Sequence, residues 1–279
     1  MVKNIETLAL KAAKLTRQTH ELGIPIMVLF EGIPASGKTR LSNELLLNFD
    51  AKYTRFITTQ SPKENDLRYQ FLQKYWNSLP KKGGINVYFR SWYSHYLDYR
   101  ENAIKSLQYP NYEVLESQIH SFEKMLIQDH YEIIKFFIEI NEEKRQEHIR
   151  QTNNNPLMQW KVQEYEKVLD SDIYLRDMHG FIERDKDWKV IDYTERQHAI
   201  EKMYEHIIKR LEKAIKKHQR QSHNYDGLFT SDYTTDFFNQ TLDKVSKKEY
   251  KSQVVDLQKR LRELQFALYD RKIPLILVF

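Results

Sequence analysis

The sequence predicts an α/β fold in which a mostly parallel sheet is covered by helices on both faces. Short runs of β-branched and aromatic residues alternate along the chain with longer segments of helical period. A glycine-rich loop joins the first of these runs to the helical segment that follows it. This alternation is typical of parallel sheets, because parallel strands need crossover connections that are usually helical. A ligand should then lie at the carboxyl ends of the strands.

The first half of the chain shows three strand-like runs separated by helical patterns. Leu8, Ala12 and Leu15 recur at helical spacing before the first run. Pro80 and the Gly83–Gly84 pair interrupt the helical pattern before the third. The expected elements are a helix over residues 5–22, a strand ending at residue 30, a helix to about residue 48, a strand over 54–58, a helical stretch over 67–79 and a strand over 85–89.

The second half continues the alternation and closes with an amphipathic helix. Residues 133–140 mix β-branched and aromatic side chains as a buried strand does, and Asn141 is a suitable N-cap for the next helix. One face of the last helix carries Ile200, Met203, Ile207, Leu211 and Ile215. The expected elements are a helix-rich stretch over about 94–128, a strand over 133–140, a helix over 141–150, a strand over 188–192 and a helix over 199–216.

The loop after the first strand matches the phosphate-binding pattern G-x-x-x-x-G-K-[ST]. Gly32 and Gly37 allow backbone N–H groups to turn toward an anion, and the following helix adds the positive end of its dipole. We expect Lys38 to reach the outer phosphates and the Thr39 hydroxyl to bind Mg²⁺. A chance match is disfavoured because only 7 glycines occur in 279 residues. The candidate phosphate-binding residues of this segment are Gly32, Ser36, Gly37, Lys38, Thr39 and Arg40.

Composition narrows the classes of partner. The net charge of +5 is compatible with a solvated surface or with an anionic partner, and the loop favours nucleotide or polyphosphate over nucleic acid. The absence of cysteine excludes a disulfide framework and thiolate metal sites. No apolar run approaches the roughly 20 residues of a membrane span, and the N-terminus lacks a signal-like apolar segment. We therefore expect a cytoplasmic protein with neither a membrane nor a nucleic acid as partner.

The end of the chain repeats the segment that precedes the loop. Residues 272–279 echo residues 23–30, and this similarity extends backward at a common offset of 249, as a duplicated domain would produce. The corresponding leucines are Leu8 with Leu257 and Leu15 with Leu264. Coincidence between two helix–strand pairs is the alternative. The expected organisation is a P-loop domain over 1–219, a linker over 220–250 and the helix and first strand of a second copy over 251–279, so that the chain is a fragment of a tandem protein.

Longer motifs accompany the loop. They are Phe89-Arg90-Ser91-Trp92-Tyr93, Phe122-Glu123-Lys124-Met125-Leu126, Lys135-Phe136-Phe137 and Asn155-Pro156-Leu157-Met158-Gln159-Trp160-Lys161. With the loop, they resemble the family-2 polyphosphate kinases over about residues 5–215, and the doubled layout resembles the tandem polyphosphate:AMP phosphotransferases of that family. The resemblance implies a P-loop kinase-like three-layer fold with a helical lid, Mg²⁺ as cofactor, and phosphoryl transfer between polyphosphate and AMP or ADP.

The functional residues of the family are only partly present. The family's loop lysine falls on Lys38 and the arginine after its second acidic motif falls on Arg90, and these are the catalytic candidates. Lys161, in the lid motif, is a further phosphate-binding candidate. The resemblance places two Mg²⁺-holding aspartates at positions that here carry Pro34 and Phe89, which cannot bind a metal. Where the family has lid arginines, this chain has Thr152, Asn153 and Asn154.

Two hypotheses follow for this domain. In the first, it transfers phosphoryl groups between polyphosphate and an adenine nucleotide. In the second, which we favour, it is catalytically degenerate and serves as a phosphate-binding, nucleotide-binding or structural half that supports an active second copy. Glu31 and Asp192 also end strands, and each either compensates for the missing acids or bonds a local partner. The expected partners are polyphosphate, an adenine nucleotide, the second tandem domain and another copy of the chain.

Overall fold

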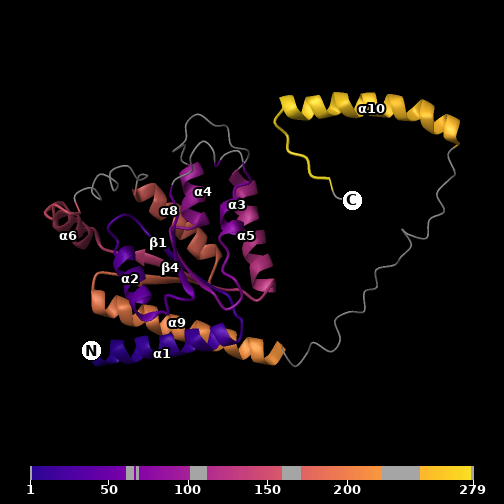
Figure 1. Cartoon of the computed structure of the whole chain (residues 1–279). Helices are drawn as coiled ribbons and strands as arrows, with labels where there is room; N and C mark the ends of the chain where they lie inside the picture. Colours follow the sequence, from indigo (N-terminus) through magenta and orange to yellow (C-terminus); the bar gives the residue numbers. More distant parts are fainter. Residues whose placement is uncertain are drawn as a thin grey trace. The chain divides into compact units, whose positions relative to one another are not determined.

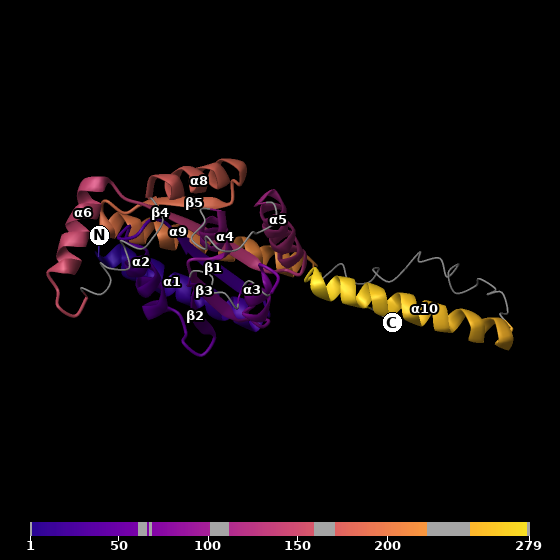
Figure 2. The ribbon, with the colours of Figure 1, turned by 90° about the horizontal axis from the view of Figure 1, so that it is seen from above.

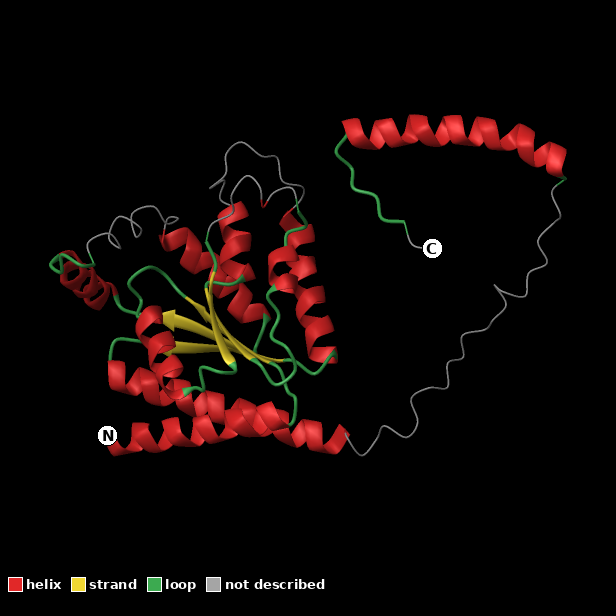
Figure 3. Cartoon of the chain, viewed as in Figure 1, coloured by secondary structure: helices red, strands yellow, loops and turns green. Residues whose placement is uncertain are grey.

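Five strands of the computed structural model form one parallel sheet in the order β2-β3-β1-β4-β5, which confirms the predicted α/β fold (Figure 3). The strands are β1 (Ile26–Glu31), β2 (Thr54–Thr58), β3 (Ile85–Phe89), β4 (Glu132–Glu139) and β5 (Trp188–Asp192). The structure describes residues 2–60, 66, 69–100, 112–158, 171–221 and 246–277. All five strands lie within about a residue of the expected ranges, because apolar runs of this length between breakers specify strands well.

The helices match the sequence expectation less closely than the strands do. They are α1 (Val2–Glu21), α2 (Lys38–Asn48), α3 (Gln73–Asn77), α4 (Trp92–Arg100), α5 (Tyr112–Gln128), α6 (Glu142–Asn153), α8 (Ser171–Arg184), α9 (Arg196–Gln221) and α10 (Lys247–Asp270). Within the described residues, α3 is much shorter than the expected stretch over 67–79, and α8 was not expected at all. The Asn141 cap is confirmed, since its side chain accepts a hydrogen bond from the Lys144 backbone N–H.

Two hydrophobic cores cover the two faces of the sheet and produce three layers (Figure 1, Figure 2). Alternate residues of the fully buried β1 point to opposite faces, as the two-residue period of a strand requires. Ile26, Val28 and Phe30 join the core with α1, α2 and α9, whereas Met27 and Leu29 join the core with α3, α4, α5 and α8. Strand β1 is central, with β3 and β4 on its two sides, so the loop that follows it leaves from the middle of the sheet.

The long helix α9 carries the apolar stripe that its sequence predicts. The five stripe residues Ile200, Met203, Ile207, Leu211 and Ile215 are all buried. Helix α1 packs alongside α9 and contributes the buried Ala9 and Ala12 to the same core (Figure 1). None of the helices in the described ranges is both long and apolar enough to cross a membrane.

Residues 227–279 form a separate unit. Its described part is α10, whose N-cap Ser246 accepts a hydrogen bond from the Glu249 backbone N–H, followed by residues 271–277. The expected first strand of a second copy is not formed over residues 273–277. A strand exists only through hydrogen bonds to a neighbour, and the described residues offer none here. The duplicated layout therefore stays a prediction.

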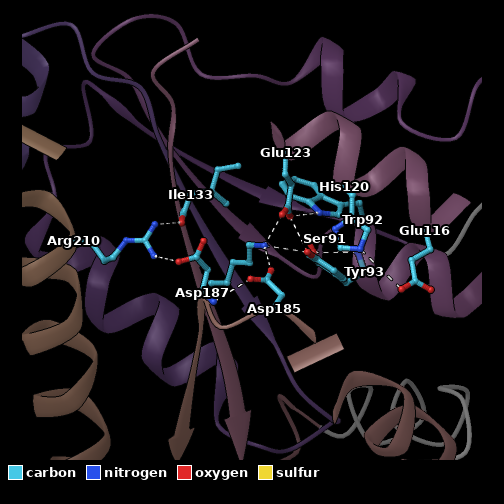
Figure 4. Close-up of polar contacts among 11 residues, drawn as sticks. Ser91, Trp92, Tyr93, Glu116, His120, Glu123, Ile133, Asp185, Asp187 and Arg210 are labelled. Carbon is cyan, nitrogen blue, oxygen red and sulfur yellow. Dashed lines mark hydrogen bonds and ion pairs between the residues drawn. The ribbon is translucent and has the colours of Figure 1, made fainter. Parts of the chain in front are cut away.

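A buried polar cluster joins three of the sequence motifs on the α4 and α5 side of the sheet (Figure 4). Lys135 of β4 contacts the Glu123 and Asp185 carboxylates at 2.5 Å each and the Tyr93 hydroxyl at 3.1 Å. Trp92 Nε1 and the Tyr93 hydroxyl each donate to Glu123 at 2.9 Å. The cluster fixes α4 and α5 to the sheet, and within it Trp92 and Tyr93 are buried packing residues.

Asp185 lies at the edge of this cluster and is only partly desolvated. Burial disfavours the ionised Asp185, but the hydrogen bond and the charge of Lys135 outweigh it and lower the pKa of the Asp185 carboxyl below its ordinary value. Burial, with the Glu123 charge, raises the pKa of the Tyr93 hydroxyl well above its ordinary value. Lys135 is thus the cation that pairs with both carboxylates of the cluster, Glu123 and Asp185.

Replacement of that cation should destabilise the fold strongly. We expect Lys135→Met to lower the free energy of unfolding by about 3 kcal/mol, because it leaves Glu123 and Asp185 without the cation that pairs with them. Urea denaturation followed by circular dichroism measures the change. Lys124→Met, an exposed position on the same helix as Glu123, is the matched control and should change the value by about 0.5 kcal/mol or less. Equal changes in the free energy of unfolding for Lys135→Met and Lys124→Met would contradict the stabilising role of Lys135.

Candidate functional site

The glycine-rich loop lies at the carboxyl end of β1 and leads directly into α2 (Figure 1). Gly32 has φ 142° and Gly37 has φ 99°, backbone conformations that other residues rarely adopt. A Cβ atom on Gly32 would lie 2.4 Å from the Ile138 carbonyl oxygen, and one on Gly37 would lie 2.3 Å from the Tyr193 ring. The two glycines are therefore required by the close packing of the loop against β4 and against the residue that follows β5.

Lys38 lies folded back on this loop. Its Nζ donates to the carbonyl oxygens of Gly32 and, at 3.2 Å, of Ile33. Burial lowers the pKa of Lys38 to about 7, an effect that Glu31 opposes and Arg90 reinforces. The Phe89 ring centroid lies 5.4 Å from Nζ, so an aromatic face and not a carboxylate borders the ammonium on that side.

Glu31, the last residue of β1, is fully buried and accepts four hydrogen bonds. The donors are the Ser91 backbone N–H at 2.6 Å, the Ser91 hydroxyl at 2.7 Å, the Ser94 hydroxyl at 2.5 Å and the Tyr174 hydroxyl at 2.9 Å. Tyr174 also accepts from the Gly32 backbone N–H at 3.2 Å, so this amide is bound by protein. Of the two roles left open for Glu31, the structure shows the local one.

Arg90 follows β3 with a φ of 62° and is held by a carboxylate. Its Nη2 contacts both carboxylate oxygens of Asp98 at 2.7 Å, and its backbone N–H donates to the Phe30 carbonyl at 3.2 Å. Although burial disfavours the charge, Asp98 and Glu31 raise the pKa of Arg90 above its ordinary value. Arg90 therefore lies beside the loop with a local partner, and its catalytic role stays a prediction.

Lys74 is a second cation near Arg90 that the sequence analysis missed. Its Nζ lies 3.4 Å from Nε2 of the buried His95, and burial lowers the pKa of Lys74 to about 8. Burial, with the Lys74 charge, lowers the pKa of His95 to about 2, so this imidazole is neutral. A single lysine in a short helix gives no pattern by which sequence reasoning would have found it.

Helix α6 also contacts the loop, and this too was missed. Arg145 Nε donates to the Pro34 carbonyl at 3.2 Å, and His148 Nδ1 lies 3.0 Å from the Ala35 carbonyl. His148 Nε2 lies 3.4 Å from Nη1 of Arg40. The i,i+3 spacing of Arg145 and His148, just after a strand that ends at the same edge as β1, is the available signal.

A pocket of about 330 Å³ opens beside this contact. It lies where α2, α6 and the segment after β5 meet, and its lining includes Arg40, Lys144, His148, Gln151, Tyr193 and Arg196. Arg40 and Thr39, both expected in the site, are exposed, while the Ser36 hydroxyl is buried and has no hydrogen-bond partner among the described residues. The pocket is lined by these basic residues and also by the acidic Glu147 and Glu195.

The donor set does not fit a Mg²⁺ ion. Pro34 and Phe89 offer no oxygen ligand from their side chains, and the Glu31 oxygens are occupied. Asp192 accepts from the backbone N–H of Thr194 at 2.8 Å and from its hydroxyl at 2.5 Å. Within the described ranges, no three His, Cys, Asp or Glu side chains are grouped so as to hold a metal. Binding of Mg²⁺ by the Thr39 hydroxyl stays a prediction.

The lid region is described only in part. Thr152 lies in α6 and donates to the His148 carbonyl at 2.8 Å, and Asn153 and Asn154 are exposed. None of these three side chains supplies the positive charge that an arginine would. Lys161 lies outside the described residues, so its role stays a prediction.

Comparison with known proteins relates the chain to polyphosphate enzymes. The family model Polyphosphate kinase 2 (PPK2) matches residues 2–219. The chain is 23% identical over 163 residues to ADP-polyphosphate phosphotransferase 3 of Rhizobium meliloti, covering 57% of this chain and 56% of that protein. It is 22% identical over 139 residues to the Polyphosphate:AMP phosphotransferase of Pseudomonas syringae pv. tomato, covering 50% of this chain and 28% of that protein. The chain therefore spans about half the length of the first of these relatives and less than a third of the second.

The same relationship appears in the fold. The crystal structure of Polyphosphate Kinase 2 from Arthrobacter aurescens TC1 superimposes with a TM-score of 0.61 at 17% identity, covering 77% of this chain and 78% of that one. At this identity the likeness shows the fold. The three-layer P-loop kinase-like architecture that the sequence predicts is thus confirmed.

The buried Lys38 should make stability depend on pH. Its pKa is about 7 in the folded chain and near 10.5 when unfolded, so between these values the unfolded state binds more protons and stability rises with pH. We expect the slope, at most about 1.4 kcal/mol per pH unit, to be reduced in Lys38→Met. Urea denaturation at pH 7 and pH 9 measures it. Lys14→Met, an exposed position in α1, is the control, and an unchanged slope in Lys38→Met would refute the buried state of the amine.

Proposed function

This chain belongs to the polyphosphate kinase 2 family, and from that premise we propose that its P-loop domain binds the phosphates of polyphosphate or of an adenine nucleotide without catalysing their transfer by itself. One observation carries the proposal. The loop keeps its lysine at the carboxyl end of the central strand, while the positions that should hold a metal carry Pro34 and Phe89. Binding of phosphate needs cations at the loop, whereas transfer also needs a metal held by carboxylates. The loop has the lysine that binding needs and lacks the carboxylates that transfer needs.

Phosphate binding is supported by the cations and by the loop shape. Lys38 lies against loop carbonyls that an anion can displace, since a charge-assisted bond to phosphate is stronger than a neutral one. Arg40 and Arg145 flank the same loop. The helix α2 begins at Lys38, so its positive dipole end faces the loop.

Loss of transfer is supported by the missing carboxylates and lid charges. Phosphoryl transfer depends on metal ions that bridge the phosphates and on cations that stabilise the transition state. Glu31 cannot replace the missing acids because its oxygens accept four protein hydrogen bonds. Thr152, Asn153 and Asn154 stand where the family resemblance places arginines.

We propose further that a second copy of the domain performs the chemistry. The similarity of residues 272–279 to residues 23–30 supports this. In such an arrangement the degenerate domain would hold substrate or support assembly.

The alternative is that this domain is itself a polyphosphate-dependent phosphotransferase. The retained Lys38 and Arg90 favour it, since both lie at the carboxyl edge of the sheet. For Arg90 to act on phosphate, its ion pair with Asp98 would have to open.

A turnover assay separates the two. With AMP, polyphosphate and Mg²⁺, we expect no ADP above the protein-free blank, whereas polyphosphate should raise the melting temperature, because a ligand that binds the folded state stabilises it. Lys38→Ala should abolish that rise, and Lys14→Ala should retain it. Formation of ADP that Lys38→Ala removes would establish the catalytic alternative. A melting temperature indifferent to polyphosphate would leave no support for binding.

Restoring the acids tests the degeneracy argument. We expect the double variant Pro34→Asp with Phe89→Asp to gain Mg²⁺-dependent formation of ADP, because the two carboxylates would provide metal ligands beside Lys38. The control Pro34→Ala with Phe89→Ala removes the same side chains without adding acids. Equal activity in the two double variants would contradict the argument.

A further inference from the structure

The side chains around the loop can neutralise a phosphate chain without a metal ion. We propose that this loop binds inorganic polyphosphate independently of Mg²⁺, with Arg145 providing positive charge beside Pro34, the third residue of the loop. The inference rests on the proposed function and specifies the form of its ligand, the metal-free polyanion. It follows from the mismatch between the donor set and the ion that the family resemblance implies.

A divalent cation at this loop would meet positive charge in place of carboxylates. Lys38 borders the Phe89 ring at 5.4 Å, and the Pro34 side chain offers no donor. Glu31 lies close enough to act on the charge of Lys38, but its oxygens are turned toward Ser91, Ser94 and Tyr174. The positive charge of Lys38 thus disfavours a divalent cation at the loop and favours an anion.

Arg145 is held at the loop by its place in the fold. Strand β4 ends beside β1, and α6 starts three residues later, which brings Arg145 Nε within 3.2 Å of the Pro34 carbonyl. The Arg145 side chain is 15% exposed, and its Nη1 contacts Glu142 at 3.0 and 3.1 Å. Glu142 is 63% exposed, so solvent screens the carboxylate side of this pair and a more highly charged phosphate can compete for the guanidinium.

Arg40 extends the positive surface away from the loop. Because the Ala35 carbonyl can only accept, Nδ1 of His148 donates to it, and Nε2 of His148 lies 3.4 Å from Nη1 of Arg40. Arg40 lines the 330 Å³ pocket together with Lys144, Arg196 and the acidic Glu147 and Glu195, but among the described residues no ion pair joins Arg40 to a carboxylate. Its planar guanidinium can therefore offer its charge to an anion.

This arrangement predicts an unusual response to Mg²⁺. An ion that coordinates free polyphosphate reduces the charge on which Lys38, Arg40 and Arg145 act, so Mg²⁺ should weaken binding or leave it unchanged. A loop that holds its ligand through a metal would show the opposite response.

Calorimetric titration of the full chain with tripolyphosphate tests the proposal. We expect binding in EDTA that is equal to, or tighter than, binding at 5 mM Mg²⁺ (an added concentration of about that size suffices to complex the probe). Arg145→Met should weaken binding in EDTA about tenfold or more, since it removes charge-assisted hydrogen bonds. Arg150→Met, an exposed arginine of the same helix, is the matched control and should bind as the unaltered chain does.

The outcomes are separable. Binding that appears only with Mg²⁺ overturns the inference and leaves the proposed phosphate-binding function standing. Equal affinities for Arg145→Met and Arg150→Met overturn the role of Arg145. Absence of binding in both conditions overturns the inference together with the polyphosphate binding in the proposed function. The comparison of EDTA with Mg²⁺ uses the unaltered chain, so it does not depend on the folding of any variant.

Discussion

The buried carboxylate of Glu31 is the constraint on which the site depends. It ends the central strand, and its four hydrogen bonds reach the segment before α4, α4 itself and α8. An ionised carboxylate in a core requires such compensation, because desolvation without partners is strongly unfavourable. Through Tyr174 the same network binds the Gly32 amide, so the start of the glycine-rich loop is fixed by the residue just before it.

This constraint also limits what the loop can do. With Glu31 occupied, the negative charge beside Lys38 acts through space and offers no lone pairs to a metal. Phe89 is paired in register with Phe30 at the end of β3, at the position where the family resemblance places a metal-holding aspartate. The Lys38 ammonium is therefore bordered by an aromatic ring and by loop carbonyls.

The sequence predicted the sheet and much of the core because local periodicity specifies them. The continuous apolar run of β1 and the apolar stripe of α9 required no knowledge of distant partners. The site was less predictable, since its contacts join residues far apart in sequence. Arg145 meets Pro34 across 111 positions and Tyr174 meets Glu31 across 143, and no local pattern encodes either contact. The sequence marked Arg90 only as a catalytic candidate, and its ion pair with Asp98 became apparent only once α4 was placed.

The physical separation of binding from transfer explains how a chain can keep the first without the second. Holding a polyanion needs positive charge in a fixed place, which Lys38, Arg40 and Arg145 supply from α2 and α6. Transfer needs in addition a metal held by carboxylates and a lid that adds charge as the phosphoryl group moves. On the proposal that this domain binds without transferring, the absence of the two acids would remove only the second requirement, because close packing around Gly32 and Gly37 shapes the loop. A loop of this kind retains its geometry when its chemistry changes.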